Sequence, residues 1–209
     1  MEKTYECVIL ADGDYPSHPI PVGILSKAQF VCCCDRAALE YIQQGGMPDA
    51  IVGDGDSLPA ELKEKYADRL HIVDEQEYND LTKATLHCMS LGYKHIAYVG
   101  CTGKREDHTI GNISLMLYYA SVLGIEVTMY TDHGYFTPAL STKTFSSHKG
   151  QQVSIFRGTA HDLISKGLKW ETRPYMQAWQ GTLNEAQNEH FTITADGSFI
   201  VFQTYPSAQ

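Results

Sequence analysis

Two aspartates stand two positions apart in a glycine-bounded turn, in the segment 53–57 (GDGDS). The turn follows the apolar run 50–52, and carboxylates so placed can share one hard cation. Mg²⁺ prefers oxygen ligands and usually takes one or two carboxylates, which leaves its other positions to water and substrate phosphates. Asp54 and Asp56 therefore indicate a magnesium nucleotide site. The alternative interpretation is a turn that uses Asp and Gly for backbone reasons alone.

A third carboxylate, Asp80, follows the acidic segment 74–77 (DEQE) and stands at the start of a predicted helix. From there it can face inward as a third metal ligand. The other interpretation is that Asp80 only complements the helix dipole, which contributes about 0.3–1 kcal/mol.

The loop 100–108 (GCTGKREDH) contains two glycines and two cations and opens a second predicted helix. Backbone amides at a helix start favour phosphate binding, and so does a guanidinium, which can donate two parallel hydrogen bonds to phosphate oxygens. The loop is not a P-loop, because Arg105 follows Lys104 where that motif requires Ser or Thr. An ordinary surface turn with solvated cations is the alternative.

Three other side chains have two interpretations each. His108, at the start of the predicted helix, is a base or ligand, or else a hydrogen-bonded packing residue. Trp170 and Trp179 are core or interface residues, or else aromatic platforms for a cationic ring.

The first part of the chain, residues 1–134, must supply the elements that position these residues. In it, short apolar runs alternate with segments of helical periodicity. This pattern is typical of an α/β domain with a largely parallel sheet. The predicted strands are 7–11, 30–34, 50–52, 71–73, 95–99 and 126–130. Nearly every strand ends in a polar residue or a glycine: Asp12, Asp35, Asp54, Asp74 and Gly100. Open α/β sheets bind ligands in the crevice outside the carboxyl ends of their strands, so we expect these residues to line one site.

Two helices complete this part of the chain. The first is predicted to begin after Asn79 as its N-cap, to end at Gly92, and to bury the periodic positions Leu81, Ala84, Thr85, Cys88 and Leu91. The second is predicted over 108–123, and it should bury Ile110, Ile113, Leu117 and Ala120. Its interior Gly111 suggests close packing or ligand approach, since glycine costs roughly 1 kcal/mol there relative to alanine.

The second part of the chain, residues 135–209, changes to short alternating segments at 142–146, 152–156, 162–165, 191–194 and 199–204. Asp196-Gly197, between the last two segments, predicts a hairpin with a type I′ turn. We therefore expect a second, smaller domain of antiparallel strands, arranged as a β-sandwich.

Composition excludes several classes of protein. The chain has 209 residues, a net charge of −9 and no block of Lys or Arg, which disfavours binding to nucleic acid or to an anionic membrane. Residues 1–6 lack the features of a signal peptide, and no apolar run approaches the ~20 residues of a transmembrane helix, so we expect a cytoplasmic protein. The six cysteines lack metal-ligand spacing, and we expect them to be reduced and mostly buried.

The order of these motifs resembles that of the thiamin pyrophosphokinase family, whose members move a pyrophosphoryl group from ATP to the hydroxyl of thiamin. Segment 34–38 (CDRAA) resembles the family's Ala-Asp-Gly-Gly/Ala element, and 48–57 (PDAIVGDGDS) resembles its Pro-Asp and Gly-Asp-Phe-Asp-Ser signature. Segment 75–84 (EQEYNDLTKA) is similar to its acidic Asp-Gln-Asp-x-Thr-Asp-x-x-Lys element. The loop 100–108, with Asn112 beyond it, is similar to its Gly-x-x-Gly-Gly-Arg-x-Asp-His loop. Segments 167–170 (GLKW) and 181–184 (GTLN) resemble its Gly-Leu-x-Trp/Tyr and Ser-x-Ser-Asn elements.

The resemblance implies a Rossmann-like ATP domain joined to a thiamin-binding β-sandwich, in a homodimer with thiamin bound at the subunit interface. It implies Mg²⁺ held by Asp54, Asp56 and Asp80, one of which accepts the thiamin hydroxyl proton, and Arg105 offsetting charge on the transferred group. The implied nucleotide-binding residues are Asp35, Arg36, Ser57, Gly103, Lys104, Arg105, Asp107, His108 and Asn112. The implied thiamin-binding residues are Trp170, Thr182 and Asn184.

The chain departs from the family pattern at several positions: Arg36 and Lys104 replace Gly, Gly55 replaces an aromatic residue, Glu77 replaces Asp, and Thr182 and Leu183 alter the Ser-rich element. The metal and phosphate positions are kept, so the departures bear mostly on thiamin recognition. Two other hypotheses stay open: a pyrophosphokinase for another small alcohol such as a hydroxymethylpterin, and a non-catalytic nucleotide or thiamin sensor.

Overall fold

The computed structural model describes residues 5–174 and 177–206. Residues 1–4, part of the segment where the sequence predicts no signal peptide, lie outside this range. The chain divides into two compact units, one of Met1–Leu115 with Ile125–Asp132 and the other of Met116–Gly124 with His133–Gln209. No helix among the described residues is long and apolar enough to cross a membrane.

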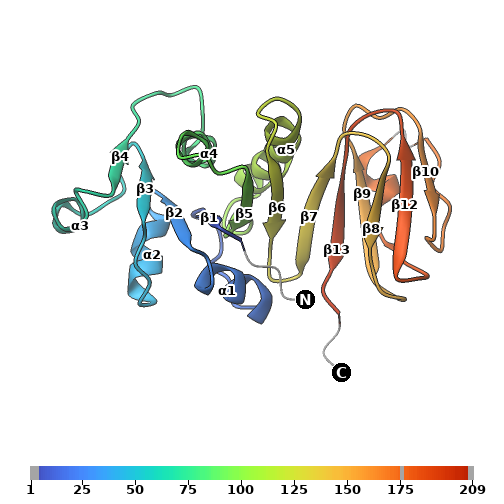
Figure 1. Cartoon of the computed structure of the whole chain (residues 1–209), viewed down its shortest axis with the longest axis horizontal. Coiled ribbons are helices and arrows are strands. Elements are labelled where there is room, and N and C mark those ends of the chain that lie inside the picture. The colour runs from blue at the N-terminus through green and yellow to red at the C-terminus, as the bar shows by residue number, and fades with distance from the viewer. Residues whose placement is uncertain (1–4, 175–176, 207–209) are drawn as a thin grey trace. The chain divides into compact units, whose positions relative to one another are not determined.

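The first unit contains a parallel sheet in the order β6-β5-β1-β2-β3-β4 (Figure 1). Its strands are β1 (Cys7–Leu10), β2 (Phe30–Cys34), β3 (Ala50–Gly53), β4 (Leu70–Ile72), β5 (His95–Val99) and β6 (Glu126–Tyr130). The predicted parallel sheet is confirmed, with every strand boundary within one residue of its prediction. The runs form strands because they are short and mostly apolar, and β1, β2 and β3 are buried almost throughout, as parallel strands covered on both faces must be.

All six cysteines are free and buried, as predicted. Cys32, Cys33 and Cys34 on β2 alternate between the two faces of the sheet and are at most 3% exposed. They act as small apolar residues that fill both sides of a central strand.

Three helices cover the two faces of this sheet: α1 (Pro19–Ser26), α2 (Ala37–Gln43) and α4 (Asp80–Ser90). A fourth, α3 (Ala60–Lys65), lies in the connection from β3 to β4 and has no buried residue. Figure 1 shows α4 on one face and α1 and α2 on the other. The Asn79 side chain caps α4 by accepting a hydrogen bond from Thr82 N at 3.0 Å, and Gly92 follows the helix with φ 96°. Both predicted ends are confirmed. Leu91 is 53% exposed because it is the C-cap, beyond the last buried turn, so its predicted burial is wrong.

The helix α5 (Glu106–Ser121) differs from its prediction in the face that it buries. Its buried side chains are Met116 and Tyr119, whereas Ile110 is 69% exposed. A Cβ added at Gly111 would meet no described atom within 4 Å, so the close packing expected there is wrong, and ligand approach stays a prediction. The helix is divided between the two compact units, which meet in the chain at Leu115 and Met116.

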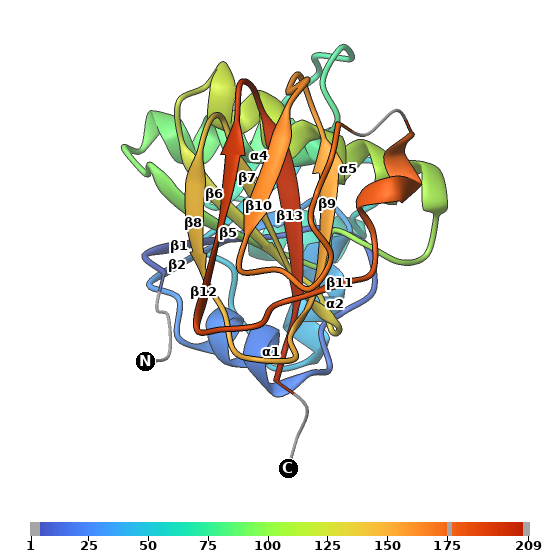
Figure 2. The same ribbon diagram turned by 90° about the vertical axis from the view of Figure 1, so that its right-hand side faces the viewer.

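The second unit is a sandwich of two antiparallel sheets, as predicted (Figure 2). One sheet has the order β11-β9-β13-β7, and the other has the order β10-β12-β8. The strands are β7 (Gly134–Ala139), β8 (Lys143–Ser146), β9 (Gln152–Arg157), β10 (Leu163–Lys166), β11 (Asn184–Glu185), β12 (His190–Ala195) and β13 (Phe199–Thr204), with a short 3₁₀ helix, η1 (Ala178–Gly181). Side chains of both sheets form one buried core, among them Ile155 and Phe199 facing Phe145 and Phe191.

The predicted hairpin at Asp196-Gly197 is wrong. β12 pairs with β8 and β10, whereas β13 pairs with β7 and β9, so this turn carries the chain from one sheet to the other. Neither turn residue has the positive φ of a type I′ turn. Gly197 is needed instead because a Cβ there would lie 2.7 Å from Ala160 N.

The strand β7 is absent from the sequence prediction. It contains Pro138, and proline within an apolar run disfavours a strand because it cannot donate a ladder hydrogen bond. Pro138 nevertheless lies opposite Ile200 of β13 in a regular antiparallel register. The cross-strand contact of Phe136 with Phe202, with ring centroids 4.6 Å apart, contributes to this pairing.

Acid should destabilise the contact between β4 and α4, where the rings of His71 and His87 lie 4.1 Å apart. Burial, and then the neighbouring His71, lower the pKa of His87 below its ordinary value. The unfolded chain therefore binds more protons near pH 6, and the stability due to neutral His87 is lost as pH falls through that range. We expect the fall in melting temperature between pH 7 and pH 5 to be smaller in His87→Gln than in the wild type. His190→Gln, on the exposed start of β12, is the control, and an equal reduction in both variants would contradict the assignment.

Candidate functional site

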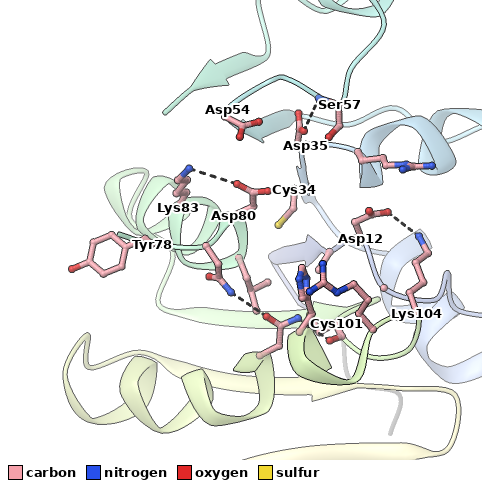
Figure 3. Close-up of a pocket in the computed structure, with 18 of the residues that line it drawn as sticks. Asp12, Cys34, Asp35, Asp54, Ser57, Tyr78, Asp80, Lys83, Cys101 and Lys104 are labelled. Carbon is pink, nitrogen blue, oxygen red and sulfur yellow. Dashed lines mark hydrogen bonds and ion pairs between the residues drawn. The ribbon is translucent and has the colours of Figure 1, made fainter. Parts of the chain in front are cut away.

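A pocket of about 480 Å³ lies in the first unit at the carboxyl ends of β1, β2 and β3, beside the start of α4 and the loop after β5 (Figure 3). Most of the predicted site residues line it: Asp35, Arg36, Asp54, Ser57, Asp80, Gly103, Lys104, Arg105, His108 and Asn112. Asp12 also lines it, as expected of a strand-end residue, whereas Asp56, Asp74 and Asp107 are not among the lining residues.

The position of the pocket follows from the order of the strands. β1 lies between β2 and β5, so the connections from β1 to β2 and from β5 to β6 leave the sheet in opposite directions. The loops part at such a reversal, and open α/β sheets bind their ligands there.

Three carboxylates converge in the pocket from different elements: Asp35 after β2, Asp54 after β3, and Asp80 at the start of α4 (Figure 3). Asp35 is 4% exposed; its Oδ2 accepts a hydrogen bond from Ser57 N at 3.2 Å, and its Oδ1 is buried with no hydrogen-bond partner in the described part of the chain. Burial raises the pKa of Asp80, Lys83 opposes that shift, and Asp54 and Asp35 add to it. The pocket therefore concentrates negative charge that a cation would stabilise.

The chemistry of these residues fits a hard cation, because carboxylate oxygens are its preferred ligands and one of them, Asp35 Oδ1, has no partner of its own. The specific set of Asp54, Asp56 and Asp80 stays a prediction. Asp56 is exposed outside the pocket, where its backbone N donates to Asp54 Oδ1 at 3.0 Å. Within residues 5–174 and 177–206, no group of three or more His, Cys, Asp or Glu is arranged to hold a metal.

Gly53 lets the end of β3 pass close to Asp35. A Cβ at position 53 would lie 2.6 Å from Asp35 Cβ. Gly53→Ala should therefore displace the Asp35 carboxylate, lower the free energy of unfolding by about 1–3 kcal/mol as overpacking does, and weaken the ATP binding that the family resemblance implies. Urea unfolding and calorimetric titration with ATP measure both effects. Gly111→Ala is the matched control, and because its Cβ meets no described atom it should unfold at the same or a slightly higher urea concentration. Equal behaviour of the two variants would contradict the role of Gly53.

The loop 100–108 is held against the chain that follows β1. Gly13 N donates to Gly100 O at 2.6 Å, and Asp14 N donates to Thr102 O at 2.8 Å. Gly103 has φ 84°, and a Cβ there would meet the Asp14 carboxylate at 1.9 Å. The loop therefore needs glycine to bring its backbone to the pocket.

Both cations of this loop are paired with acids. Lys104 Nζ lies 2.8 Å from Asp12 Oδ1 and 3.9 Å from Glu40 Oε2. Arg105 donates two hydrogen bonds to the Asp107 carboxylate, from Nε to Oδ1 at 3.1 Å and from Nη2 to Oδ2 at 2.5 Å. This contact lowers the pKa of Asp107. A phosphate that binds either cation must compete with a carboxylate, and Asp107 orients Arg105 from outside the pocket.

Asn112 joins the pocket loops to one another. Its Nδ2 donates to Cys101 O at 2.9 Å, and its Oδ1 accepts from Asn79 Nδ2 at 3.2 Å. Asn79 in turn caps α4, so Asn112 connects the loop after β5 to the start of that helix. His108 is exposed at the pocket rim.

The predicted site residues do not include Lys83, which the structure places inside the pocket beside Asp80. The sequence contains a pattern that could have found it: Asp80 and Lys83 are three positions apart on a helix, and residues so spaced share a face. If Asp80 faces the ligand, Lys83 faces it too.

The predicted thiamin residues Trp170, Thr182 and Asn184 lie together at a second pocket of about 380 Å³ in the second unit. Trp170 is 53% exposed and Trp179 is 69% exposed, so the interpretation of these residues as core is wrong. Lys169 Nζ lies 4.8 Å from the centre of the Trp170 ring, which shows that this ring can accept a cation.

The Asn184 side chain holds Trp170 in place by hydrogen bonds to the Trp170 backbone. Its Nδ2 donates to Trp170 O at 2.8 Å, and its Oδ1 accepts from Trp170 N at 3.2 Å. Thr182 Oγ1 donates to Trp179 O at 2.7 Å. Both polar side chains thus hold the aromatic segments around this pocket.

Comparison with known proteins gives matches along most of the chain. Residues 23–129 match the family model described as thiamin pyrophosphokinase, catalytic domain, and residues 134–202 match the one described as thiamin pyrophosphokinase, substrate-binding domain. The chain is 27% identical over 175 residues to thiamine pyrophosphokinase 1 of Oryza sativa subsp. japonica, across 73% of this chain and 64% of that protein. It is 28% identical over 106 residues to thiamin pyrophosphokinase 1 of Caenorhabditis elegans, across 46% of this chain and 43% of that protein. The chain thus spans less than two thirds of the length of either relative.

Solved structures with the same fold include the thiamine pyrophosphokinase of Bacillus subtilis, with a TM-score of 0.78 at 21% identity, covering 97% of this chain and 99% of that one. The thiamin pyrophosphokinase of Candida albicans has a TM-score of 0.78 at 17% identity, covering 96% of this chain and 90% of that one.

Proposed function

The chain belongs to the thiamin pyrophosphokinase family, and from that premise we propose that it transfers the βγ-pyrophosphoryl group of ATP to the hydroxyl of thiamin, which yields thiamin diphosphate and AMP. We assign the ATP chemistry to residues 1–134 and thiamin binding to residues 135–209. The two matched family models, at residues 23–129 and 134–202, support this division.

The convergence of Asp35, Asp54 and Asp80 in one pocket, beside a glycine-bearing loop at a helix start, carries this proposal. Three carboxylates repel a bare polyphosphate, so the pocket suits ATP only as a complex with a cation. Asp54, Asp56 and Asp80 would hold Mg²⁺, with Asp35 beside them, and Mg²⁺ supplies neutralisation of the phosphate charge when bound.

The protein's own residues would bind and orient the reacting groups. Phosphoryl transfer depends mostly on positioning and charge stabilisation. Arg105, once it exchanges Asp107 for phosphate, would stabilise charge on the transferred oxygens, with Lys104 beside it. Asp35, Arg36, Ser57, Gly103, His108 and Asn112 would order the nucleotide and its loop, and one of the pocket carboxylates would accept the thiamin hydroxyl proton.

The second pocket would bind thiamin, with the Trp170 ring against a thiamin ring and with Thr182 and Asn184 close by. We also propose a homodimer with its active site at the subunit interface, as the family resemblance implies. The six free cysteines support a cytoplasmic location, since thiols stay reduced there.

The test is AMP release from ATP and Mg²⁺ by the purified protein, with and without thiamin, with the second product identified by mass. Thiamin-dependent AMP together with thiamin diphosphate is the expected result. AMP formed only with another acceptor, such as a hydroxymethylpterin, would replace thiamin as the substrate. ATP binding with no AMP from any acceptor would favour a sensor.

A further inference from the structure

A second cavity of the first unit lies between α1 and α2, the two helices on the same face of its sheet (Figure 1). This α1–α2 cavity has a volume of about 820 Å³ and is lined by the chain after β1, by both helices and by the loop that follows α2. No described residue lines both this cavity and the pocket of the proposed ATP site. The α1–α2 cavity is therefore a separate candidate site.

The lining of the α1–α2 cavity is largely apolar and aromatic. Val22 and Leu25 come from α1, and Met47 comes from the loop after α2. Val22 is 39% exposed and Met47 is 63% exposed, so apolar surface stays uncovered at this place. Tyr15 and Tyr41, both half-buried, add two aromatic rings. Sites for organic ligands have linings of this kind, with a few polar groups that fix the orientation of the ligand.

The Tyr41 ring is held closely by its own chain. A Cβ at Gly46 would lie 2.4 Å from Tyr41 Cε2, so only glycine lets the backbone pass directly against the ring. Burial raises the pKa of Tyr41 to about 12, and burial also raises the pKa of Tyr15. Both phenols therefore stay neutral at physiological pH and present uncharged rings to the cavity.

Glu40 supplies the charge of the α1–α2 cavity. Among the described lining residues it is the one carboxylate, and no lysine, arginine or histidine accompanies it there. Its side chain is 40% exposed, and its ion pair is long, with Oε2 3.9 Å from Lys104 Nζ. Lys104 lies closer to Asp12 Oδ1, at 2.8 Å, and neutralises that acid first. Glu40 thus leaves a negative charge beside the two tyrosine rings.

We propose that the α1–α2 cavity binds a small aromatic cation, with the ring of the ligand on the apolar wall and its positive group among Glu40, Tyr15 and Tyr41. Aromatic rings attract cations, and the attraction increases when the cation is desolvated. The carboxylate adds an ionic contact that a neutral or anionic ligand of the same shape does not make. The bound cation would compete with Lys104 for Glu40, which connects this cavity to the loop 100–108.

The probe for the experiment is phenyltrimethylammonium, titrated into the wild type and followed by the ¹³C-methyl NMR signal of Met47, which Met47→Leu assigns. The expected result is a saturable shift of this signal. Glu40→Gln and Tyr41→Leu should each weaken the affinity for the probe about fivefold or more. Lys104→Met should strengthen it about twofold, because Glu40 loses the ammonium that competes with the probe. Glu40→Gln keeps the size of the side chain, so it decides the outcome even if Tyr41→Leu fails to fold.

Two controls accompany these variants. Glu64→Gln, at an exposed acid of the same unit, should leave the affinity for the probe unchanged. Benzenesulfonate, an aromatic anion of similar size, should cause no saturable shift. Equal binding of the two compounds, a shift that does not saturate, or unchanged affinity in Glu40→Gln would overturn the assignment. Displacement of the probe by AMP would also overturn it, since the cavity would then belong to the nucleotide site.

Discussion

Asp54→Asn is expected to lower thiamin-dependent AMP formation by about 10²–10³-fold, the range found when a group that stabilises transition-state charge is removed. The amide keeps the size of the side chain, and its oxygen can still accept the hydrogen bond from Asp56 N. Folding should therefore stay normal, while the pocket loses a full negative charge beside Asp35 and Asp80. Initial rates at several Mg²⁺ concentrations, together with thermal unfolding, measure both properties.

Asp56→Asn tests whether Asp56 is a metal ligand, as the sequence predicts, although the pocket lining does not include it. Asp56 is exposed outside the pocket, so a loss equal to that of Asp54→Asn would mean that it turns inward when metal and ATP bind. A much smaller loss would assign the cation to Asp54, Asp80 and Asp35. Asp68→Asn is the control, since its side chain is 77% exposed on the same unit. If Asp54→Asn keeps wild-type rates at ordinary Mg²⁺ concentrations, Asp54 is not a catalytic residue.

The sequence predicts the first unit well because its information is local. A continuous apolar run such as 95–99 forms a strand wherever a parallel sheet buries both of its faces. The start of α4 depends on a cap that Asn79 makes within its own turn. Once the strands are known, their carboxyl ends must meet at one edge, so the grouping of Asp35 with Asp54 follows from the strand assignment alone.

The sequence predicts turns and burial poorly where the position of a residue depends on contacts with residues far away along the chain. Asp196-Gly197 has the composition of a tight hairpin, but the turn joins two sheets, and its glycine is required by the backbone of Ala160. The exposure of Trp170 depends on how Asn184, fourteen positions away along the chain, holds its backbone. The burial of Lys83 likewise depends on the neighbouring loops, which periodicity within one helix does not describe.

Trp170→Ala is expected to raise the KM for thiamin about tenfold or more while leaving the KM for ATP within about twofold. The indole ring is 53% exposed beside the second pocket, and it already lies 4.8 Å from one ammonium, that of Lys169. A desolvated cation over an aromatic face contributes about 2 kcal/mol or more, and thiamin contains a cationic ring. Because so much of the ring is exposed, its loss should change the melting temperature little. Initial rates with each substrate varied in turn, and thermal unfolding, test these expectations.

Two variants distinguish stacking from support of the pocket wall. Trp170→Phe keeps an aromatic face and should restore part of the thiamin affinity, whereas Trp179→Ala removes a second exposed indole that does not line this pocket and should have little effect. If Trp170→Ala raises both KM values equally, the ring supports the fold instead of binding thiamin. Asn184→Ala adds the final discrimination, because its side chain bonds the Trp170 backbone in both directions. If Asn184 acts only by placing the ring, its loss should add little to thiamin KM in a protein that already carries Trp170→Ala; a further large rise would mean that Asn184 contacts thiamin itself.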